Sequence, residues 1–393
     1  MFAIAAILLL GTSIMSGPAP ADPPRTWPAA WRAVTGPRIG VADAASARSG
    51  DLHLITGGFT EGLEATSAIQ YLHESRGWQP IGQAMLHPRA GHSLVKLDDE
   101  RIMVLGGWSG RLPDEVIQRI DAEIFEPLRP ERRRLVPSPL PDPGPQGLLG
   151  HSLTRLADGR VVLVFASHAV VFDPLHEEWS APLTLDSPRR NHAAYSPDGH
   201  SVVLVGGEKN DTIETLIPDP SGEWDVQPWT IDQSFSLQHA GLVPVDARHG
   251  LLVGGVQPDG QCSRRTWTLD VHTRQISPAM DLPWATGISR PLIARTDFGL
   301  VVVSGEYPTS AGPRPVDSAC FIQPASSRTW LLPGSPGNSI RQVLLMKSSS
   351  SFDLLGGYRY RAPERKRALT DKPAAHVLEM AHHMSLGKFA HAD

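Results

Sequence analysis

Short stretches of alternating or continuous apolar residues, separated by polar turns, run through most of the chain. Residues 89–108 show the unit clearly. An alternating stretch from His92 to Leu97 predicts one β-strand, residues 98–100 predict a polar turn, and the apolar stretch from Ile102 to Leu105 predicts a second strand. The second strand stops at Gly106-Gly107, so the unit is a β-hairpin that ends in a double glycine.

The same unit recurs along the chain at a mean spacing of about 50 residues, which matches the length of one four-stranded propeller blade. The double glycine, or the pair that replaces it, begins at Gly57, Gly106, Phe165, Gly206, Gly254, Ser304 and Gly356. These copies predict an all-β chain that folds as a seven-bladed β-propeller with four-stranded blades. Phe165 and Ala166 replace the double glycine in the third copy, so a six-bladed ring with a degenerate extra segment is the alternative.

The repeat resembles that of the Kelch β-propellers, the architecture of the central domain of galactose oxidase and of many non-enzymatic binding proteins. The resemblance implies the propeller fold and leaves the function open. A copper centre of the galactose oxidase kind would need two tyrosines and two histidines, with a cysteine crosslinked to one tyrosine. None of the five tyrosines is adjacent to a cysteine in the sequence. We therefore expect no copper oxidase activity and no cofactor.

The last copy of the repeat lacks a recognisable fourth strand. Its first three strands are predicted at residues 342–346, 352–355 and 376–380. A segment around Trp31, before the first complete hairpin, has the form of an outer strand, so we expect it to complete the last blade and close the ring. The propeller is thus predicted to span residues 22–380, with residues 381–393 as a flexible tail.

Composition excludes some classes of function. The 393 residues carry a net charge of −5, which is not the basic footprint of a nucleic-acid-binding protein. Glycine and proline each number 36, which suits many short strands joined by tight turns. We expect no nucleic-acid partner and one repeat domain instead of two separate ones.

The amino terminus resembles a secretory signal peptide over residues 1–21. It contains an apolar stretch from Phe2 to Leu10 and an Ala19-Pro20-Ala21 cleavage site, but no basic residue. We expect an exported protein, periplasmic or extracellular, with no stable membrane span after cleavage; an uncleaved anchor is the alternative. Export permits a disulfide between Cys262 and Cys320, and two unpaired thiols are the alternative.

Tryptophan and histidine each recur at one position of several repeats, and we predict a structural role for both. Outer-strand tryptophans are predicted to fill the wedge between neighbouring blades; they are Trp78, Trp179, Trp224 and Trp330. Histidines near the start of first strands are predicted to belong to the hydrogen bonding of the repeat more than to one common site; they are His92, His151, His192 and His239.

Segments that lead into the first strands of a propeller converge on one mouth of its channel. The residues predicted at this mouth, five of them arginines, are Arg38, Arg89, Arg190 with Asn191, Gln238 with His239, Arg290, and Arg341 with Gln342. Guanidinium groups around a concave surface suit a carboxylate, a sulfate or an acidic peptide loop. The alternative is that these arginines pair with an aspartate or a backbone carbonyl of a neighbouring blade.

The loops between second and third strands are expected on the same face, and they are long. Within them, Trp108, Arg111, Tyr358 and Arg359 combine the aromatic and guanidinium groups that are enriched at binding hot spots. We therefore include these four residues in the candidate ligand-binding site.

Two hypotheses for the function follow. The first is an exported binding module that recognises a protein or an acidic carbohydrate or peptide at the mouth and long loops. The second is a sugar-processing enzyme similar to Kelch-type epimerases or mutarotases, with Glu208, Glu306, His239 or His192 as an acid or base. No Ser-His-Asp, P-loop or zinc signature is present, and we assign no catalytic or metal-binding residue.

Overall fold

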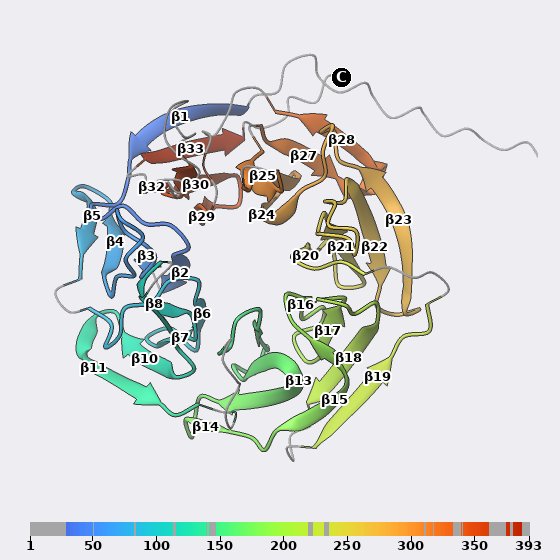
Figure 1. Ribbon diagram of the computed structural model, residues 1–393, viewed down its shortest axis with the longest axis horizontal. Coiled ribbons are helices and arrows are strands. Elements are labelled where there is room, and N and C mark those ends of the chain that lie inside the picture. Colours follow the sequence, from blue (N-terminus) through green and yellow to red (C-terminus); the bar gives the residue numbers. More distant parts are fainter. Residues whose placement is uncertain are drawn as a thin grey trace, which may run out of the picture.

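The chain forms a closed ring of antiparallel β-sheets around a central channel (Figure 1). A computed structural model describes residues 29–49, 51–81, 84–112, 115–138, 140, 147–218, 223–231, 236–309, 312–316, 318–332, 339, 341–360, 375–377 and 380–386. Within these residues, six sheets of four strands and one of five surround the channel, and two strand pairs form separate hairpins. The predicted all-β propeller is confirmed, and its blades number seven when the five-stranded sheet is counted with the others.

The blades follow one another in chain order, each running from an inner strand to an outer one. Blade 1 contains β2 (Ala45–Ser49), β3 (Leu52–Thr56), β4 (Ile69–His73) and β5 (Gly77–Pro80). Blade 2 contains β6 (Ser93–Lys96), β7 (Ile102–Leu105), β10 (Ala122–Glu126) and β11 (Arg129–Val136). Blade 3 contains β12 (Ser152–Arg155), β13 (Val161–Asp173), β14 (Glu178–Trp179) and β15 (Leu183–Arg189). Blade 4 contains β16 (Ala193–Tyr195), β17 (Val202–Val205), β18 (Ile213–Pro218) and β19 (Trp224–Pro228).

The remaining blades complete the ring. Blade 5 contains β20 (Gly241–Pro244), β21 (His249–Val253), β22 (Arg265–Asp270) and β23 (Gln275–Asp281). Blade 6 contains β24 (Ser289–Thr296), β25 (Gly299–Tyr307), β26 (Arg314–Pro315), β27 (Cys320–Gln323) and β28 (Arg328–Leu331), with the 3-10 turn η1 (Pro324–Ser326). Blade 7 contains β29 (Val343–Ser348), β30 (Ser351–Leu355), β33 (Met380–Leu386) and β1 (Ala29–Thr35).

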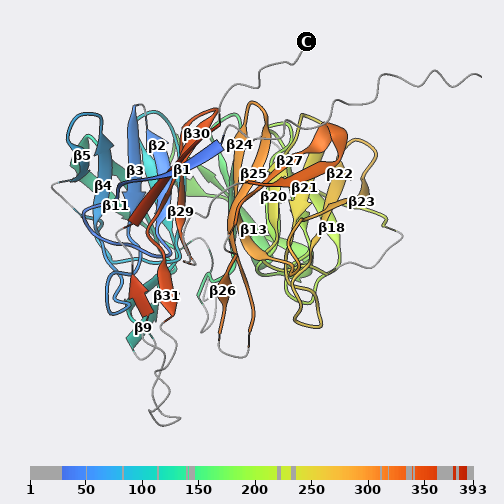
Figure 2. The same ribbon diagram turned by 90° about the horizontal axis from the view of Figure 1, so that it is seen from above.

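Three long connections between second and third strands extend from the same face of the ring. They hold the hairpin of β8 (Trp108–Arg111) and β9 (Glu115–Gln118), the short strand β26, and the hairpin of β31 (Tyr358–Tyr360) and β32 (Ala375–Val377). Figure 2 shows β9, β26 and β31 on one side of the blades. The prediction that the long loops share a face is confirmed for these described segments.

The hydrophobic core of the molecule lies between the blades. Seven clusters of buried apolar side chains each join one blade to the next, including the last blade to the first. Phe125 and Leu54, for example, belong to the cluster between blades 1 and 2, and both are almost fully buried. Because burying one such side chain stabilises a fold by about 1.5–3 kcal/mol, a blade gains most of its stability from its neighbours.

The outer-strand tryptophans pack as predicted. Trp78 is 2% exposed and belongs to the cluster between blades 7 and 1. The ring of Trp179 lies 4.9 Å from that of Phe172, and Trp330 lies 5.9 Å from Phe321. These plates fill the wide outer part of the wedge between blades, where the strands diverge.

The double glycines join neighbouring blades through their backbones. The N–H of the second glycine donates to a carbonyl in the segment that leads into the next blade; the pairs are Gly58 to Arg89 (2.7 Å), Gly207 to Leu237 (3.0 Å), Gly255 to Ile288 (2.7 Å) and Gly357 to Val41 (2.8 Å). The last of these pairs links blade 7 to blade 1. In these four repeats, the motif that marks the repeat in the sequence is therefore also a contact that attaches it to the next one.

Glycine is required at these contacts for two reasons. Gly57 and Gly58 have positive φ angles of 57° and 97°, which side chains other than hydrogen rarely tolerate. A Cβ atom on Gly57 would also lie 2.2 Å from the carbonyl oxygen of Arg89 and 2.7 Å from Cε1 of His92. The first glycine thus makes room for the next blade, and the second bonds to it.

The ring closes through the N-terminal strand, as predicted. Strand β1 pairs antiparallel with β33, so that Trp31 lies opposite Met384. The ring of Trp31 packs edge-on against Phe352 in the same blade, at 5.9 Å. The first described segment of the chain thus becomes the outermost strand of the last blade.

The third strand of blade 7 differs from the prediction. It is β33 (Met380–Leu386), not residues 376–380; residues 375–377 pair with β31 instead. The prediction that the tail begins at residue 381 is therefore wrong for residues 381–386. His382, His383 and Ser385 interrupt the apolar positions of this strand and hide its pattern. Residues 387–393 and the predicted signal peptide lie outside the described residues.

Two further observations bear on the sequence analysis. In the part of the chain that the structure describes, no helix is long and apolar enough to cross a membrane. Cys262 and Cys320 are free thiols; the first is partly buried and the second is fully buried in blade 6.

We expect Gly57→Ala to destabilise the ring much more than Gly62→Ala. Both glycines have positive φ, but a Cβ on Gly62 would meet no atom within 4 Å. The Gly62 variant should lose about 1–2 kcal/mol of unfolding free energy from backbone strain alone. The Gly57 variant should lose about 3 kcal/mol or more, because the carbonyl of Arg89 must also move. Urea unfolding measures both, and equal losses would show that close approach between blades does not select this glycine.

Candidate functional site

Seven equivalent residues, one from each blade, surround the channel at the start of the inner strands. We call them the mouth residues: Asp43, Gly91, Gly150, Asn191, His239, Arg290 and Arg341, and all have positive φ, between 51° and 82°. Their backbones connect successive blades. The N–H of Gly91 donates to the carbonyl of Asp43, and that of Asp43 donates to Arg341, which links blade 1 to blades 2 and 7. Asn191, His239 and Arg290 each donate in the same way to the mouth residue of the preceding blade, at 2.8 Å.

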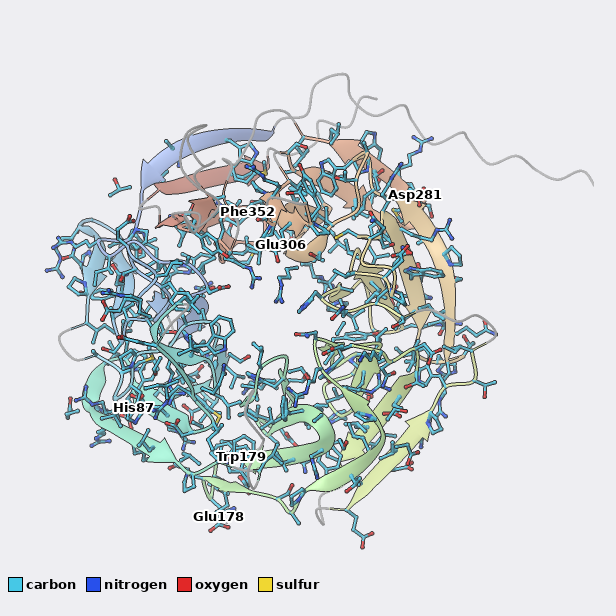
Figure 3. The ribbon with its side chains drawn as sticks, viewed as in Figure 1. His87, Glu178, Trp179, Asp281, Glu306 and Phe352 are labelled. Carbon is cyan, nitrogen blue, oxygen red and sulfur yellow. The ribbon has the colours of Figure 1, made fainter. Side chains whose placement is uncertain are left out.

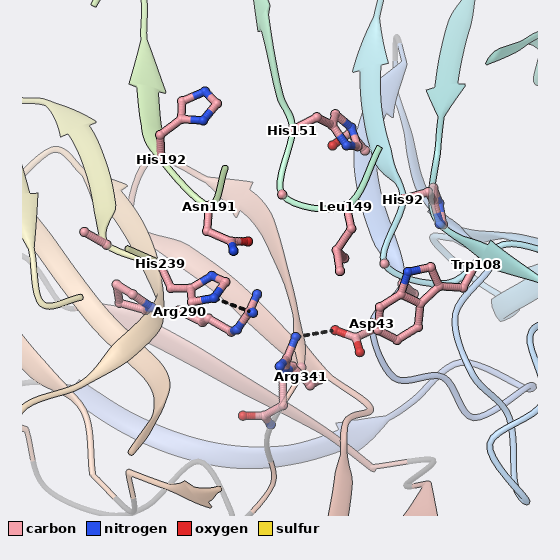
Figure 4. Close-up of a pocket in the computed structure, with 17 residues that line it drawn as sticks. Asp43, His92, Trp108, Leu149, His151, Asn191, His192, His239, Arg290 and Arg341 are labelled. Atoms are coloured by element: carbon pink, nitrogen blue, oxygen red, sulfur yellow. Dashed lines mark hydrogen bonds and ion pairs between the residues drawn. The ribbon is translucent and has the colours of Figure 1, made fainter. Parts of the chain in front are cut away.

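The mouth residues and the residues that follow them line a pocket of about 600 Å³ (Figure 4). His92, His151 and His192 follow the mouth residues of blades 2–4, and Trp108 from the β8–β9 hairpin adds an aromatic wall. This volume falls within the usual range for small-molecule sites. The pocket therefore draws side chains from every blade and from one of the long loops.

Backbone strain at the mouth argues that its side chains have a function. Glycine adopts a positive φ without strain, whereas other residues lose about 1–2 kcal/mol each there. Blades 2 and 3 have glycine at the mouth position, but the other five blades have Asp43, Asn191, His239, Arg290 and Arg341. Among the described residues, these are five of the eleven non-glycine residues with positive φ. Strain retained at one site is typical of a binding or catalytic centre.

Blades 5, 6, 7 and 1 supply the charged half of the pocket. Arg341 donates two hydrogen bonds to Glu306, from Nε to Oε2 and from Nη2 to Oε1, both at 3.1 Å. Nη1 of Arg341 lies 3.3 Å from Oδ1 of Asp43. Nε of Arg290 lies 3.1 Å from Oε1 of the same Glu306. The Glu306 side chain is only 9% exposed, whereas that of Arg290 is 38% exposed. Glu306 thus pairs with both arginines and leaves Arg290 partly exposed. Figure 3 labels Glu306 beside the channel, and Figure 4 shows Arg290 and Arg341 at the pocket.

The arginines of this half remain charged at neutral pH. Burial and the adjacent Arg341 lower the pKa of Arg290 to about 10. Burial alone would also lower the pKa of Arg341, but the carboxylates of Asp43 and Glu306 outweigh it and raise that pKa above its ordinary value. Nη2 of Arg290 donates to Nε2 of His239 at 2.9 Å, so this imidazole carries its proton on Nδ1.

Blades 2–4 supply a wall of neutral imidazoles. Burial, with a nearby arginine, lowers the pKa of His92 and of His192 to about 3, and burial lowers that of His151 to about 4. His92 bonds to Thr56 of the preceding blade at 2.8 Å, and His192 bonds to Ser152 of its preceding blade at 2.7 Å. The expected role of these histidines in the hydrogen bonding of the repeat is confirmed for these two, and both also line the pocket.

The sequence placed four of the mouth residues correctly and missed the others. Asn191, His239, Arg290 and Arg341 come together as predicted, and Trp108 joins them. The expected ring of five arginines is wrong, because Arg38, Arg89 and Arg190 do not line this pocket. The mouth positions of blades 1, 2 and 4, which these arginines were expected to fill, belong to Asp43, Gly91 and Asn191, and that of blade 3 belongs to Gly150.

Each of the three misplaced arginines has another partner. Nε of Arg38 donates to the backbone carbonyl of Trp78 at 2.9 Å. Arg89 is fully buried, bonds to the carbonyls of Gly106 and Asp121, and forms an ion pair with Asp121 at 2.7 Å. The guanidinium carbon of Arg190 lies 4.6 Å from the centre of the Phe165 ring.

The counterpart of Arg89 in blade 4 is Arg189. It is also fully buried, bonds to the carbonyls of Gly206 and Thr212, and pairs with Glu214 at 3.2 Å. The prediction therefore chose Arg190 in place of the true equivalent one residue earlier. Within each of these blades, the buried arginine ties the double glycine to the start of the third strand, which is a structural role.

The predicted loop residues divide in the same way. Arg111 is exposed and pairs with Glu64 at 3.1 Å, outside the residues that line the pocket. Tyr358 begins β31 and lies close enough to Arg290 and Arg341 to act on their charges. Arg359 follows it in β31, and its side chain lies outside the described part of the structure.

Sequence reasoning missed Asp43 and did not predict that Glu306, a candidate acid or base, pairs with two arginines. A usable signal for the mouth position was present. Gly91 and Gly150 stand directly before His92 and His151, and such isolated glycines mark a positive φ that the other blades must also adopt.

No protein-family model matches the chain, and a search of curated proteins gives no match. Among the described residues, no group of three or more His, Cys, Asp or Glu side chains is placed to hold a metal ion. The geometry of the pocket itself therefore carries the functional argument.

The strain at the mouth predicts a difference between two variants of His239. His239→Gly and His239→Ala both remove the imidazole, but only glycine tolerates the φ of 57°. The glycine variant should be more stable by about 1 kcal/mol in urea unfolding. At His92, where φ is not positive, the alanine variant should instead be more stable than the glycine variant, by about 0.5–1 kcal/mol. Equal stability of the two His239 variants would mean that the mouth is not strained.

The buried histidines predict that the ring loses stability as the pH falls below about 6.5. In the unfolded chain they bind protons at this pH, but in the folded chain they stay neutral until about pH 3–4. Each should lower the unfolding free energy by up to about 1.4 kcal/mol per pH unit across pH 6 to 4.5. His192→Gln should reduce the pH dependence of the unfolding free energy by up to the amount that one proton contributes. His176 is exposed and its pKa is raised, so His176→Gln should not reduce it. Denaturant unfolding at three pH values tests this, and an unchanged slope in His192→Gln would contradict it.

Proposed function

We propose that this chain is an exported, Kelch-like propeller module that binds an anionic ligand at its channel mouth. The ligand belongs to the acidic saccharides or to an acidic segment of a protein. Its carboxylate or sulfate group contacts Arg290 and Arg341, and the long loops of blades 2, 6 and 7 contact the rest of it.

The arrangement of Arg290 around Glu306 carries this proposal. A guanidinium held by a buried carboxylate keeps a fixed orientation, and its exposed donors can then form charge-assisted hydrogen bonds with little loss of entropy. Arg341 is fixed more firmly, by Glu306 and Asp43 together. Five side chains kept at strained backbone positions around the same pocket add independent support.

Binding is favoured over catalysis by the state of the candidate acids and bases. A general base works best when its pKa lies near the working pH. The pKa of His192 and of His239 is lowered to about 3, mainly by burial, so both are weak bases. Glu306 is engaged by two arginines, and Glu208 is not among the residues that line the pocket.

We expect Arg290→Gln to weaken binding of acidic ligands by about tenfold or more, because it removes one charge-assisted contact of about 1.5–3 kcal/mol. Isothermal titration calorimetry with acetate, sulfate and glucuronate, and with a glutamate-rich peptide, measures this. Arg248→Gln is the matched control, since Arg248 is an exposed, ion-paired arginine in the turn between β20 and β21 and does not line the pocket.

The control should change each affinity by less than about twofold, as is usual for a surface ion pair. The proposal fails if none of the anions binds, or if Arg290→Gln and Arg248→Gln bind them equally well. Fractionation of cells that produce the chain with and without residues 1–21 tests export separately.

A further inference from the structure

Blades 1, 2, 4, 5 and 6 repeat one backbone contact at the edge of the channel. In each of them, the residue just before the mouth residue pairs with the residue just after the double glycine or its substitute. The pairs are Ala42 with Phe59, Ala90 with Trp108, Arg190 with Glu208, Gln238 with Val256 and Ser289 with Glu306. In blades 1, 2 and 5 the two residues exchange both N–H···O=C hydrogen bonds, at 2.7–3.1 Å. This contact fixes the loop after the second strand beside the mouth.

Blade 3 lacks this contact. Its second and third strands lie within the single strand β13, so no long loop separates them. The residue before the mouth residue of this blade is Leu149. Among the residues that the structure describes, no backbone hydrogen bond involves the N–H or the C=O of Leu149. Blade 3 therefore leaves open a position that the loops of the other blades fill.

The side chain of Leu149 is left uncovered at the same place. Leu149 is 40% exposed and lines the pocket (Figure 4), whereas the equivalent Ala42 and Ala90 of blades 1 and 2 are fully buried. A single exposed leucine is common on protein surfaces. Here it coincides with an unpaired backbone N–H and C=O inside a pocket, and such a backbone edge is a template for pairing with another chain.

The other blades show which group fits beside Leu149. The residues that fill this position in blades 1, 2 and 5 are all apolar: Phe59, Trp108 and Val256. An extended peptide presents the N–H and the C=O of one residue on the same edge, so it can form the same bridge from outside the chain. Its side chain at that residue then lies beside that of Leu149, because directly opposed residues point to the same face of an antiparallel pair.

The charged half of the same pocket selects an acidic segment. Arg290 and Arg341 line the pocket together with Leu149, and the Arg290 side chain is 38% exposed. A guanidinium group binds a carboxylate through charge-assisted hydrogen bonds. A protein segment that carries both an apolar residue and a carboxylate therefore matches both halves, whereas a saccharide has no peptide backbone with which to repeat the bridge.

Resting on the function proposed above, we propose that the ligand is an extended, acidic segment of a protein that fills the open position at blade 3. One of its apolar residues forms with Leu149 the bridge that Phe59 and Trp108 form in blades 1 and 2. A nearby carboxylate of the segment contacts Arg290 and Arg341. The complex thus repeats between two chains a contact that the propeller makes within its other blades.

The test uses six capped peptides in which a valine and a glutamate are separated by one, two or three glycines, in either order. Each has a counterpart with serine in place of valine. In isothermal titration calorimetry on the whole chain, at least one valine peptide should bind about fivefold or more tightly than its serine counterpart, because an apolar side chain leaves water. Arg290→Gln should weaken all of the peptides.

An ester version of the tightest peptide tests the backbone bridge. An ester in place of the amide of the valine removes its N–H and should weaken binding by about threefold to tenfold. The same replacement at the following residue is the matched control. The N–H of that residue points to the opposite edge of an extended segment, so its loss should change the affinity by less than about twofold.

Leu149→Ser and Leu175→Ser form a matched pair of protein variants. Both leucines are exposed, but Leu175 is 80% exposed in the turn after β13 and does not line the pocket. Leu149→Ser should bring the valine and serine peptides to within about twofold of each other, whereas Leu175→Ser should preserve the difference between them. Thermal unfolding shows that both variants are folded.

The outcomes separate the two proposals. Peptide binding that depends on Arg290 but is unaffected by the valine, by its N–H or by Leu149→Ser overturns the bridge at blade 3 and leaves the anion site intact. Binding of glucuronate but of none of the peptides does the same. Absence of binding by the peptides and by the small anions, or binding that does not depend on Arg290, overturns the anion site and the inference with it.

Discussion

The backbone hydrogen bonds between neighbouring blades at the channel are the constraint on which the rest of this structure depends. Each blade is a small sheet that buries its faces only against the sheets beside it, so the ring is stable when every neighbour is in register. The second glycine of a repeat and the mouth residue of the next blade set this register, since both bond directly across the gap between blades. Gly357 and Val41 extend the same contact across the two ends of the chain, and the β1–β33 pair closes the outer rim.

The same constraint produces the pocket. To bond to the blade before it, each mouth residue takes a positive φ, and this conformation turns the chain around the edge of the channel. A repeat protein without a ligand would be expected to place glycine at all such positions. Gly91 and Gly150 follow that expectation, but Asp43, Asn191, His239, Arg290 and Arg341 do not. Five blades thus depart from glycine at the mouth position, where the positive φ disfavours every other residue, and these departures form the site.

This relation explains what could be predicted from the sequence. The double glycines are needed in most blades, so their spacing reveals the ring and its repeat length. The missing fourth strand of the last copy reveals closure by the segment around Trp31. The mouth itself has no shared residue type. Alignment by similarity therefore grouped Arg89 with Arg190 and not with Arg189, although only Arg189 is buried like Arg89. Glu306 lies at the end of a second strand and meets Arg290 and Arg341 only in space, so no local pattern could show that it holds both.

The charge distribution at the mouth limits how the pocket can select its ligand. Arg290 and Arg341 lie against Glu306 and Asp43, and the whole chain carries a net charge of −5, so long-range attraction of anions is weak. Selection must come instead from short-range contacts, in which the direction of each donor and acceptor matters. Neutral imidazoles suit this role, because their pKa values near 3–4 keep the wall uncharged throughout the physiological pH range. A nearly neutral pocket would therefore select a bound anion, as proposed, by the geometry of its hydrogen bonds more than by its charge.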